Sequence, residues 1–272
     1  MTLHLTRETP LQLLVSVRSA AEVAPALAGG AHIIDAKEPS RGSLGRVEPH
    51  VLSEILESVP GDYPVSVALG DFRSVADVRA ALRTVAVPAR HSPIYLKLGF
   101  AGVPFPEQIA RLLDAAVSAT QARAAPWHIV AVAYADAERA GTVSPMLIPR
   151  LAQAAGASGT LIDTWSKDGR GLLNWLSSDI LASWVAEARK AGLFTALAGS
   201  LRPDDLMLVS QAAPDVIGAR GAVCVGGREG IVSEYRVRQF RRCLPVGSSG
   251  GSPERAVPTL RETQDTGAIS LT

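Results

Sequence analysis

The stretch Ala31-His-Ile-Ile-Asp-Ala-Lys-Glu-Pro-Ser-Arg-Gly-Ser-Leu-Gly45 joins a short apolar run to a loop rich in Gly, Ser and Pro. An apolar run that ends at turn-forming residues is typical of a buried β-strand. Asp35 and Lys37 are two residues apart, so on a strand their side chains point to the same side. We therefore expect a carboxylate and an amine to lie together at the carboxyl end of a strand.

The same unit, a short apolar strand followed by a polar loop and a helix, recurs along the whole chain. The pattern predicts eight strands, at residues 13–17, 32–36, 65–69, 94–98, 129–133, 159–162, 194–198 and 216–219. Helical segments are predicted between and after them, at 19–27, 48–58, 74–85, 106–124, 145–155, 178–191, 203–210 and 233–242. Strands that are apolar on both faces belong in parallel sheets, and eight of them favour a closed (β/α)8 TIM barrel over an open doubly wound sheet. No G-x-G-x-x-G follows the first strand, which counts against a dinucleotide-binding sheet.

The composition is that of a globular chain. Of 272 residues, 47% are hydrophobic and 19% charged, and the formal net charge is +1. This charge gives no reason to expect a nucleic acid or an anionic membrane as partner, and no apolar run approaches the roughly 18 residues of a membrane span. We expect residues 1–245 to form one barrel domain. Residues 246–272 turn to Gly, Ser, Pro and polar residues, and we expect a disordered tail there.

Cysteine usage and the N-terminal sequence indicate the reducing cytoplasm. Cys224 and Cys243 make neither a disulfide framework nor a zinc pattern. The first residues show no basic region followed by an apolar core, so no secretory signal is predicted. We therefore expect a cytoplasmic protein. We also expect no metal and no cofactor, and a small phosphorylated molecule as the binding partner. A homo-oligomer remains open.

Lysine is scarce, which draws attention to each one. Among 27 basic residues only four are lysines: Lys37, Lys97, Lys167 and Lys190. Lysine can lose its proton and act as a nucleophile or base, whereas arginine cannot. The first three lie at or near the carboxyl ends of predicted strands two, four and six, where barrel active sites form. Amines gathered in one pocket lower each other's pKa, which favours a neutral, nucleophilic amine. A solvated surface charge is the alternative for each lysine, and it is the expected role of Lys190.

Acidic residues follow the same strands. Asp35 and Asp163 are placed to hold lysines in position and to shuttle protons. Satisfying the backbone of a turn is the alternative role for these acids. We expect that role for Asp136, whereas for Asp71 both roles stay open. His32 begins the second strand at the far end from the pocket, and we expect it to be structural.

Glycine-rich loops follow predicted strands seven and eight, where barrels commonly bind phosphate through backbone N–H groups. Ordinary turn glycines are the alternative. The candidate phosphate-binding residues are Gly199, Ser200, Arg220, Gly221, Gly226, Gly227 and Arg228.

Taken together, these motifs resemble the (5-formylfuran-3-yl)methyl phosphate synthase family, also called 4-(hydroxymethyl)-2-furancarboxaldehyde-phosphate synthases, over roughly residues 11–243. The runs that carry the resemblance lie at 28–37 (AGGAHIIDAK), 42–45 (GSLG), 95–99 (YLKLG), 133–136 (AYAD), 162–169 (IDTWSKDG), 196–200 (ALAGS) and 218–224 (GARGAVC). One departure is His32, where the family usually has an acid.

The resemblance implies a TIM barrel that makes a furan from two molecules of glyceraldehyde 3-phosphate, with loss of phosphate and water, for methanofuran-type C1 carriers. It implies that Lys37 is the Schiff-base lysine and Lys97 the proton acceptor, with Lys167, Asp35 and Asp163 as supporting charged residues. Two rival functions remain: another class I Schiff-base aldolase that acts on a sugar phosphate, and a non-catalytic barrel that binds a phosphate ligand.

Overall fold

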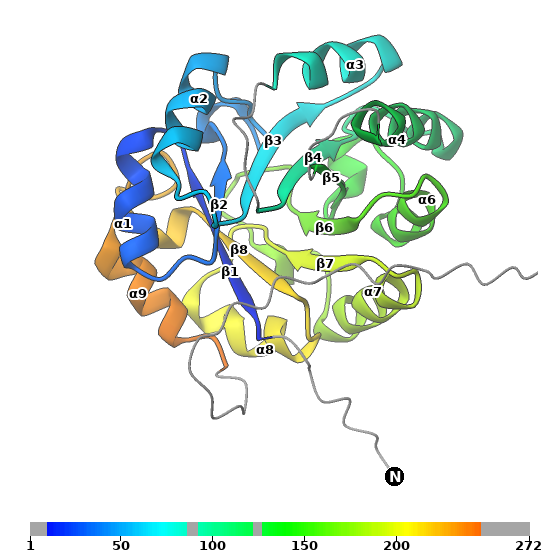
Figure 1. Cartoon of the computed structure of the whole chain (residues 1–272). Coiled ribbons are helices and arrows are strands. Elements are labelled where there is room, and N and C mark those ends of the chain that lie inside the picture. Colours follow the sequence, from blue (N-terminus) through cyan, green and yellow to red (C-terminus); the bar gives the residue numbers. More distant parts are fainter. Residues whose placement is uncertain (1–9, 86–91, 122–126, 246–272) are drawn as a thin grey trace, which may run out of the picture.

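The computed structural model describes residues 10–85, 92–121 and 127–245. Within these ranges eight parallel strands close into a barrel, in which each strand pairs with the next and β1 pairs with β8 (Figure 1). The strands are β1 Gln12–Val17, β2 Ile33–Ala36, β3 Val65–Asp71, β4 Ile94–Gly99, β5 Trp127–Tyr134, β6 Gly159–Asp163, β7 Phe194–Leu197 and β8 Val216–Ala219. The predicted TIM barrel is confirmed. The predicted tail at 246–272 lies outside the described residues.

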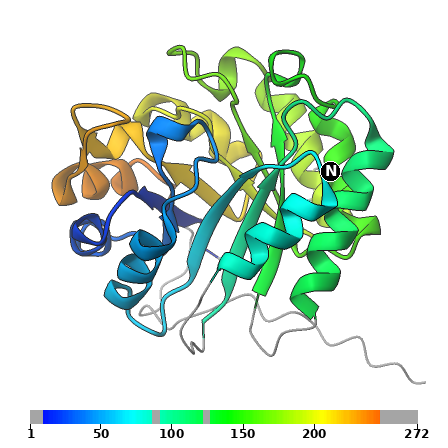
Figure 2. The same ribbon diagram turned by 90° about the horizontal axis from the view of Figure 1, so that it is seen from above.

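Helices surround the barrel, as Figure 1 shows along the barrel and Figure 2 from the side. They are α1 Val23–Ala28, α2 Pro49–Ser58, α3 Val75–Thr84, α4 Pro106–Gln121, α5 Ala137–Ala140, α6 Ile148–Ala154, α7 Ser178–Lys190, α8 Leu206–Gln211 and α9 Glu234–Arg242. Short 3-10 turns lie at Ala20–Glu22, Pro39–Arg41, Pro145–Leu147, Leu172–Asn174, Pro203–Asp205 and Gly221–Val223. No helix in the described ranges is long and apolar enough to cross a membrane.

Local sequence sets where individual helices begin. Ser74 has an extended backbone before α3, and its side chain accepts a hydrogen bond from the Asp77 N–H, which is the usual arrangement of a helix N-cap. Pro149 separates the predicted 145–155 helix into a 3-10 turn and α6, because it stands at the start of the α-helical part, where a missing N–H costs nothing.

Two apolar clusters hold the fold together. The larger one fills the layer between strands and helices and includes Leu13, Ile55 and Trp184, all fully buried. The smaller one lies inside the barrel and includes Ile33, Val130, Leu161 and Val216. The division follows from strand geometry, since alternate residues of one strand face opposite sides.

A feature that sequence reasoning did not predict is a small hairpin after β8. β9 (Cys224–Val225) pairs antiparallel with β10 (Ile231–Val232), and the Gly226-Gly227 pair turns the chain between them with positive φ angles of 85° and 76°. Only glycine adopts such angles without strain. The hairpin carries Arg228 and Glu229 at the carboxyl end of the barrel.

Candidate active site

A central cavity of about 470 Å³ lies inside the barrel. It is lined at the carboxyl ends of the strands by loop residues and, deeper, by inward side chains as far as Gln12 and Phe194. Barrel interiors are usually filled by layers of bulky side chains. Here small residues occupy inward positions on β1, β3, β7 and β8, and these are Ser16, Ser66, Ala196 and Gly218. Their small size leaves the space open.

Two ion pairs with buried carboxylates stand in this cavity, one fully buried and one partly exposed at its lysine. Lys97 Nζ lies 2.7 Å from Asp35 Oδ1, and Lys167 Nζ lies 2.8 Å from Asp163 Oδ1. Both carboxylates are 2% exposed or less. Buried charges need such partners, because each ion loses its hydration. Asp35 therefore pairs with a lysine from β4 rather than with Lys37, which directly follows the end of β2.

Neighbouring polar groups fix both carboxylates. Ser16 Oγ donates to Asp35 Oδ2 at 2.8 Å, while the Thr164 N–H donates to Asp163 Oδ1 at 2.7 Å. Burial by itself would raise the pKa of each carboxyl, but the adjacent ammonium groups and hydrogen bonds outweigh it. The pKa of Asp35 is held below its usual value by Lys97 and Lys37. Lys167 and Lys37 lower the pKa of Asp163 to about 2.

Lys37 is the lysine without an ion-pair partner. Its side chain is buried, lines the central cavity, and forms no ion pair or hydrogen bond with any described residue through Nζ. Burial lowers the pKa of Lys37 to about 7, and repulsion by Lys97 and Lys167 adds to this, while Asp163 and Asp35 oppose it. A large fraction of this amine is therefore neutral and nucleophilic near neutral pH.

The remaining acids hold loops. Asp136 is buried and accepts hydrogen bonds from the N–H groups of Trp165 and Ser166, at 2.6 and 2.8 Å. It thereby fixes the loop that carries Lys167, in the backbone role predicted for it. Asp71 Oδ1 accepts from Tyr134 Oη and from the Ala101 N–H, both at 2.8 Å. His32 Nδ1 accepts from the Leu13 N–H at 2.8 Å, which is a structural contact.

The structure brings most of the candidate phosphate-binding residues to the mouth of the cavity. Gly199, Ser200, Arg220, Gly221, Gly227 and Arg228 line it, whereas Gly226 lines an adjoining hollow with Lys167 and Arg228. Gly199 has a φ of 111°, and a Cβ there would lie 3.1 Å from the Thr164 nitrogen, so the close turn requires glycine. No described residue accepts a hydrogen bond from the N–H of Ser200 or Leu201.

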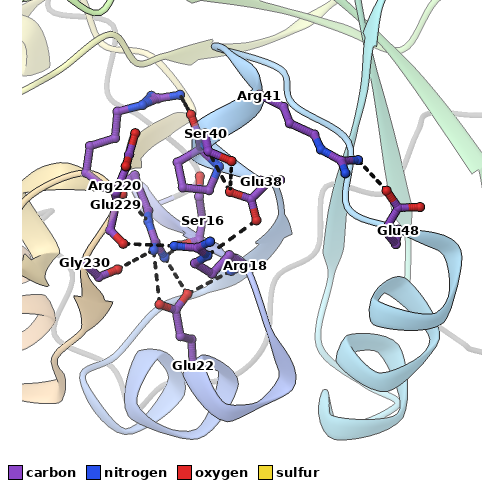
Figure 3. Close-up of polar contacts among 12 residues, drawn as sticks. Ser16, Arg18, Glu22, Glu38, Ser40, Arg41, Glu48, Arg220, Glu229 and Gly230 are labelled. Atoms are coloured by element: carbon purple, nitrogen blue, oxygen red, sulfur yellow. Dashed lines mark hydrogen bonds and ion pairs between the residues drawn. The ribbon is translucent and has the colours of Figure 1, made fainter.

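Arg220 differs from the expectation, because all its donors are engaged by the protein. Its guanidinium donates to the carbonyl oxygens of Ser16, Arg228 and Gly230 and to both carboxylate oxygens of Glu22 (Figure 3). The Arg220–Glu22 pair is almost fully buried. Arg220 has no donor left for a phosphate. Instead, it fastens the β9–β10 hairpin to the end of β1.

Two other arginines stand at the rim. Arg228 is half-buried and donates from Nη2 to the carbonyl oxygens of Pro39 and Gly42, at 2.8 and 2.5 Å, which joins the loops after β2 and β8. Arg202 lines the cavity, is exposed, and donates to the Gly169 carbonyl at 3.2 Å.

Sequence reasoning missed Arg202, although its position two residues after Ser200 was an available signal. It also missed Ser16 and Ser66, polar residues inside otherwise apolar strands.

The pKa of Lys37 can be measured residue by residue. Competitive acetylation with acetic anhydride, analysed by peptide mass spectrometry, should show labelling of Lys37 that rises about tenfold per pH unit below pH 7 and levels off above it, since only the free amine reacts. Lys190, which is exposed, serves as the reference for reagent reactivity. A Lys37 titration midpoint near pH 10 would contradict the assignment.

The buried Arg220–Glu22 pair should matter strongly for stability. Glu22→Gln leaves the Arg220 charge buried without its counter-charge, and we expect it to lower the free energy of unfolding by about 3–5 kcal/mol, measured by urea denaturation. The matched control is Glu187→Gln, which breaks an exposed pair with Lys190 and should change stability little. Equal effects of the two substitutions would contradict this prediction.

Comparison with known proteins adds to this geometry. The 4-HFC-P synthase family model matches residues 13–241. A (5-formylfuran-3-yl)methyl phosphate synthase of Methanopyrus kandleri is 37% identical over 237 residues, which is 86% of this chain and 98% of that protein. The protein of the same name from Methanocaldococcus jannaschii is 39% identical over 216 residues, covering 79% of this chain and 91% of that protein.

Solved structures with similar folds are more distant. Phosphoribosyl anthranilate isomerase of Thermus thermophilus superposes with a TM-score of 0.56 at 13% identity, over 86% of this chain and 98% of that one. A 3-hexulose-6-phosphate synthase gives 0.50 at 17% identity, over 86% and 100%. At these identities the likeness concerns the barrel alone. The family match and the identities over most of the chain, in contrast, show that this chain belongs to the 4-HFC-P synthase family.

Proposed function

We propose that this chain condenses two molecules of glyceraldehyde 3-phosphate into (5-formylfuran-3-yl)methyl phosphate through an imine on Lys37. The observation that carries the proposal is the contrast among the three lysine amines that line the cavity. Lys97 and Lys167 each have a carboxylate partner, while Lys37 has none among the described residues and its pKa is about 7. The names of the two archaeal relatives support the same product.

The first step is attack of the free Lys37 amine on a triose-phosphate carbonyl. The resulting carbinolamine loses its hydroxyl as water, and Lys97, paired with Asp35, supplies the proton. Lys97 is then a neutral amine beside an iminium ion. It can remove the proton from the neighbouring carbon, which the iminium has made acidic, to give an enamine. This order explains how an ion-paired lysine becomes the base.

The enamine expels the phosphate of the first triose, and the carbon chain so formed condenses with the second triose phosphate. Ring closure, two dehydrations and hydrolysis of the imine then give the furan and free Lys37. The overall change balances as two triose phosphates giving one furan phosphate, one phosphate and two waters. The Lys167–Asp163 pair supplies a proton donor and an acceptor on the opposite side of the cavity for these eliminations. The phosphate that stays on the product fits at the Gly199–Ser200 turn and beside Arg202.

We propose that the product serves the synthesis of a methanofuran-type C1 carrier and that the reaction takes place in the cytoplasm. Both cysteines are free in the structure, which is compatible with a reducing compartment. No cofactor takes part in the proposed steps.

Incubation with glyceraldehyde 3-phosphate alone tests the reaction. We expect a strongly ultraviolet-absorbing product whose mass is that of (5-formylfuran-3-yl)methyl phosphate, because aromatic ring formation needs no other substrate. A class I aldolase with another donor would give no such chromophore, and a non-catalytic barrel would leave the triose phosphate unchanged.

Substitution of Lys37 tests the covalent step. Borohydride reduction in the presence of glyceraldehyde 3-phosphate should add one reduced triose-phosphate unit to Lys37, seen by peptide mass spectrometry. Lys37→Arg should lose both this adduct and turnover, because the guanidinium stays protonated. Lys190→Arg is the control at an exposed lysine and should keep both. A Lys37→Arg enzyme with a near-normal rate would rule out the proposed mechanism.

A further inference from the structure

A hydroxyl group deep in the central cavity has no hydrogen-bond partner among the described residues. Ser66 lies in β3, is 1% exposed and lines the cavity, yet its Oγ forms no hydrogen bond with any described residue. Leaving a buried hydroxyl unpaired is unfavourable, so such a group calls for a specific explanation. Because Ser66 faces a cavity, a bound ligand can supply the missing partner.

Strand register places Ser66 among the catalytic candidates. Ser66 pairs with Asp35 of β2 on one side and with Tyr95 of β4 on the other. The next inward residue of β3, Ala68, pairs with Lys97. Ser66 therefore lies one inward step below Lys97, toward the amino ends of the strands. Asp35 has a serine on each side, and only Ser16 donates to it.

The cavity changes in polarity along its length. Its cationic lining residues lie at the carboxyl ends of the strands or one step below, and they are Lys37, Lys97, Lys167, Arg202, Arg220 and Arg228. The part below them has apolar walls that include Leu14, Ile33, Val130, Phe194 and Val216. No lysine or arginine among the described residues lines this lower part, and Asp215 there is acidic. A phosphate group is therefore favoured at the mouth and disfavoured at the bottom, whereas a flat uncharged ring suits the apolar walls.

We propose that Ser66 Oγ donates a hydrogen bond to the carbonyl oxygen at the uncharged end of the ligand, which is the formyl group of the furan product. The furan ring then packs in the apolar lower part of the cavity, and its phosphate stays at the mouth. This inference rests on the proposed function for the identity of the ligand. It makes Ser66 a specificity-determining residue, which selects a product with an oxygen acceptor at its inner end.

Two isosteric substitutions isolate the hydroxyl. Ser66→Thr keeps the hydroxyl and Ser66→Val replaces it by a methyl group of the same shape, so the steric effect of branching is common to both. Isothermal titration should give the Kd of two ligands for each variant: (5-formylfuran-3-yl)methyl phosphate and furan-3-ylmethyl phosphate, which lacks the formyl group.

The expected result is a coupling between the hydroxyl and the formyl group. The Val variant should bind the formyl compound about tenfold more weakly than the Thr variant does, since a buried hydrogen bond is lost. Both variants should bind the compound without the formyl group equally. The control is Ser210→Ala on α8, away from the cavity. It removes another buried hydroxyl that has no partner among the described residues, and it should leave both affinities unchanged. Thermal unfolding checks that each variant folds, and Ser66→Ala is the smaller replacement if the branched residues are not tolerated.

Equal affinities of the Thr and Val variants for the formyl compound would overturn the proposal. A shift in the pH profile of turnover without a change in product affinity would also overturn it, because Ser66 would then act on Asp35 rather than on the ligand. Borohydride trapping on Lys37 and furan formation by the unsubstituted enzyme report on the proposed function separately. If trapping and furan formation are both observed but the coupling is absent, the proposed role of Ser66 is wrong and the proposed function stands.

Discussion

The upper part of the central cavity holds three lysine amines, Lys37, Lys97 and Lys167, but only two carboxylates, and the proposed chemistry depends on this excess of one amine. Charge inside a protein persists when it is paired, and Asp35 and Asp163 each hold one lysine at ion-pair distance. Lys37 is left with two carboxylates that already have closer partners and two ammonium groups nearby. Loss of its proton relieves both the repulsion and the cost of desolvation, which is why its pKa falls to about 7. The same arrangement keeps Asp35 and Asp163 ionised, so that proton donors and acceptors are both present in a small volume.

The sequence was sufficient for the barrel because strands buried on both faces leave short apolar runs that are easy to recognise. The sequence also allowed us to predict that the three lysines lie at one end of the barrel, since parallel strands place their carboxyl ends together. Which lysine is unpaired could not be predicted, because pairing joins residues far apart in the chain. Asp35 lies two residues before Lys37 in the chain, yet its ion pair reaches across to β4. The two-residue strands of the hairpin after β8 carry too few residues for any periodicity.

Arg220 illustrates a further limit of sequence reasoning. An arginine beside glycines after the last strand has the same local signature whether it binds a phosphate or ties loops together. The deciding partner is Glu22, 198 residues earlier, and nothing in the local sequence points to it. In the structure Arg220 positions other residues of the site. It donates a hydrogen bond to the Ser16 carbonyl, and the Ser16 hydroxyl donates one to Asp35. Arg202, which is exposed, and Arg228, which is engaged only through Nη2, can still meet a phosphate at the mouth.

The Glu22–Arg220 pair also has a meaning for the order in which the chain is made. During synthesis the N-terminal part leaves the ribosome first, and Glu22 has no counter-charge until residue 220 follows. β1 likewise lacks its neighbour β8, and the Ser16 carbonyl lacks its donor. The barrel can therefore close only when nearly all of the described chain is available. Asp35 finds Ser16 and Lys97 within the first hundred residues, but the Lys167–Asp163 pair and the Arg220 donor to the Ser16 carbonyl come later, so a nascent chain cannot complete this site ahead of the fold.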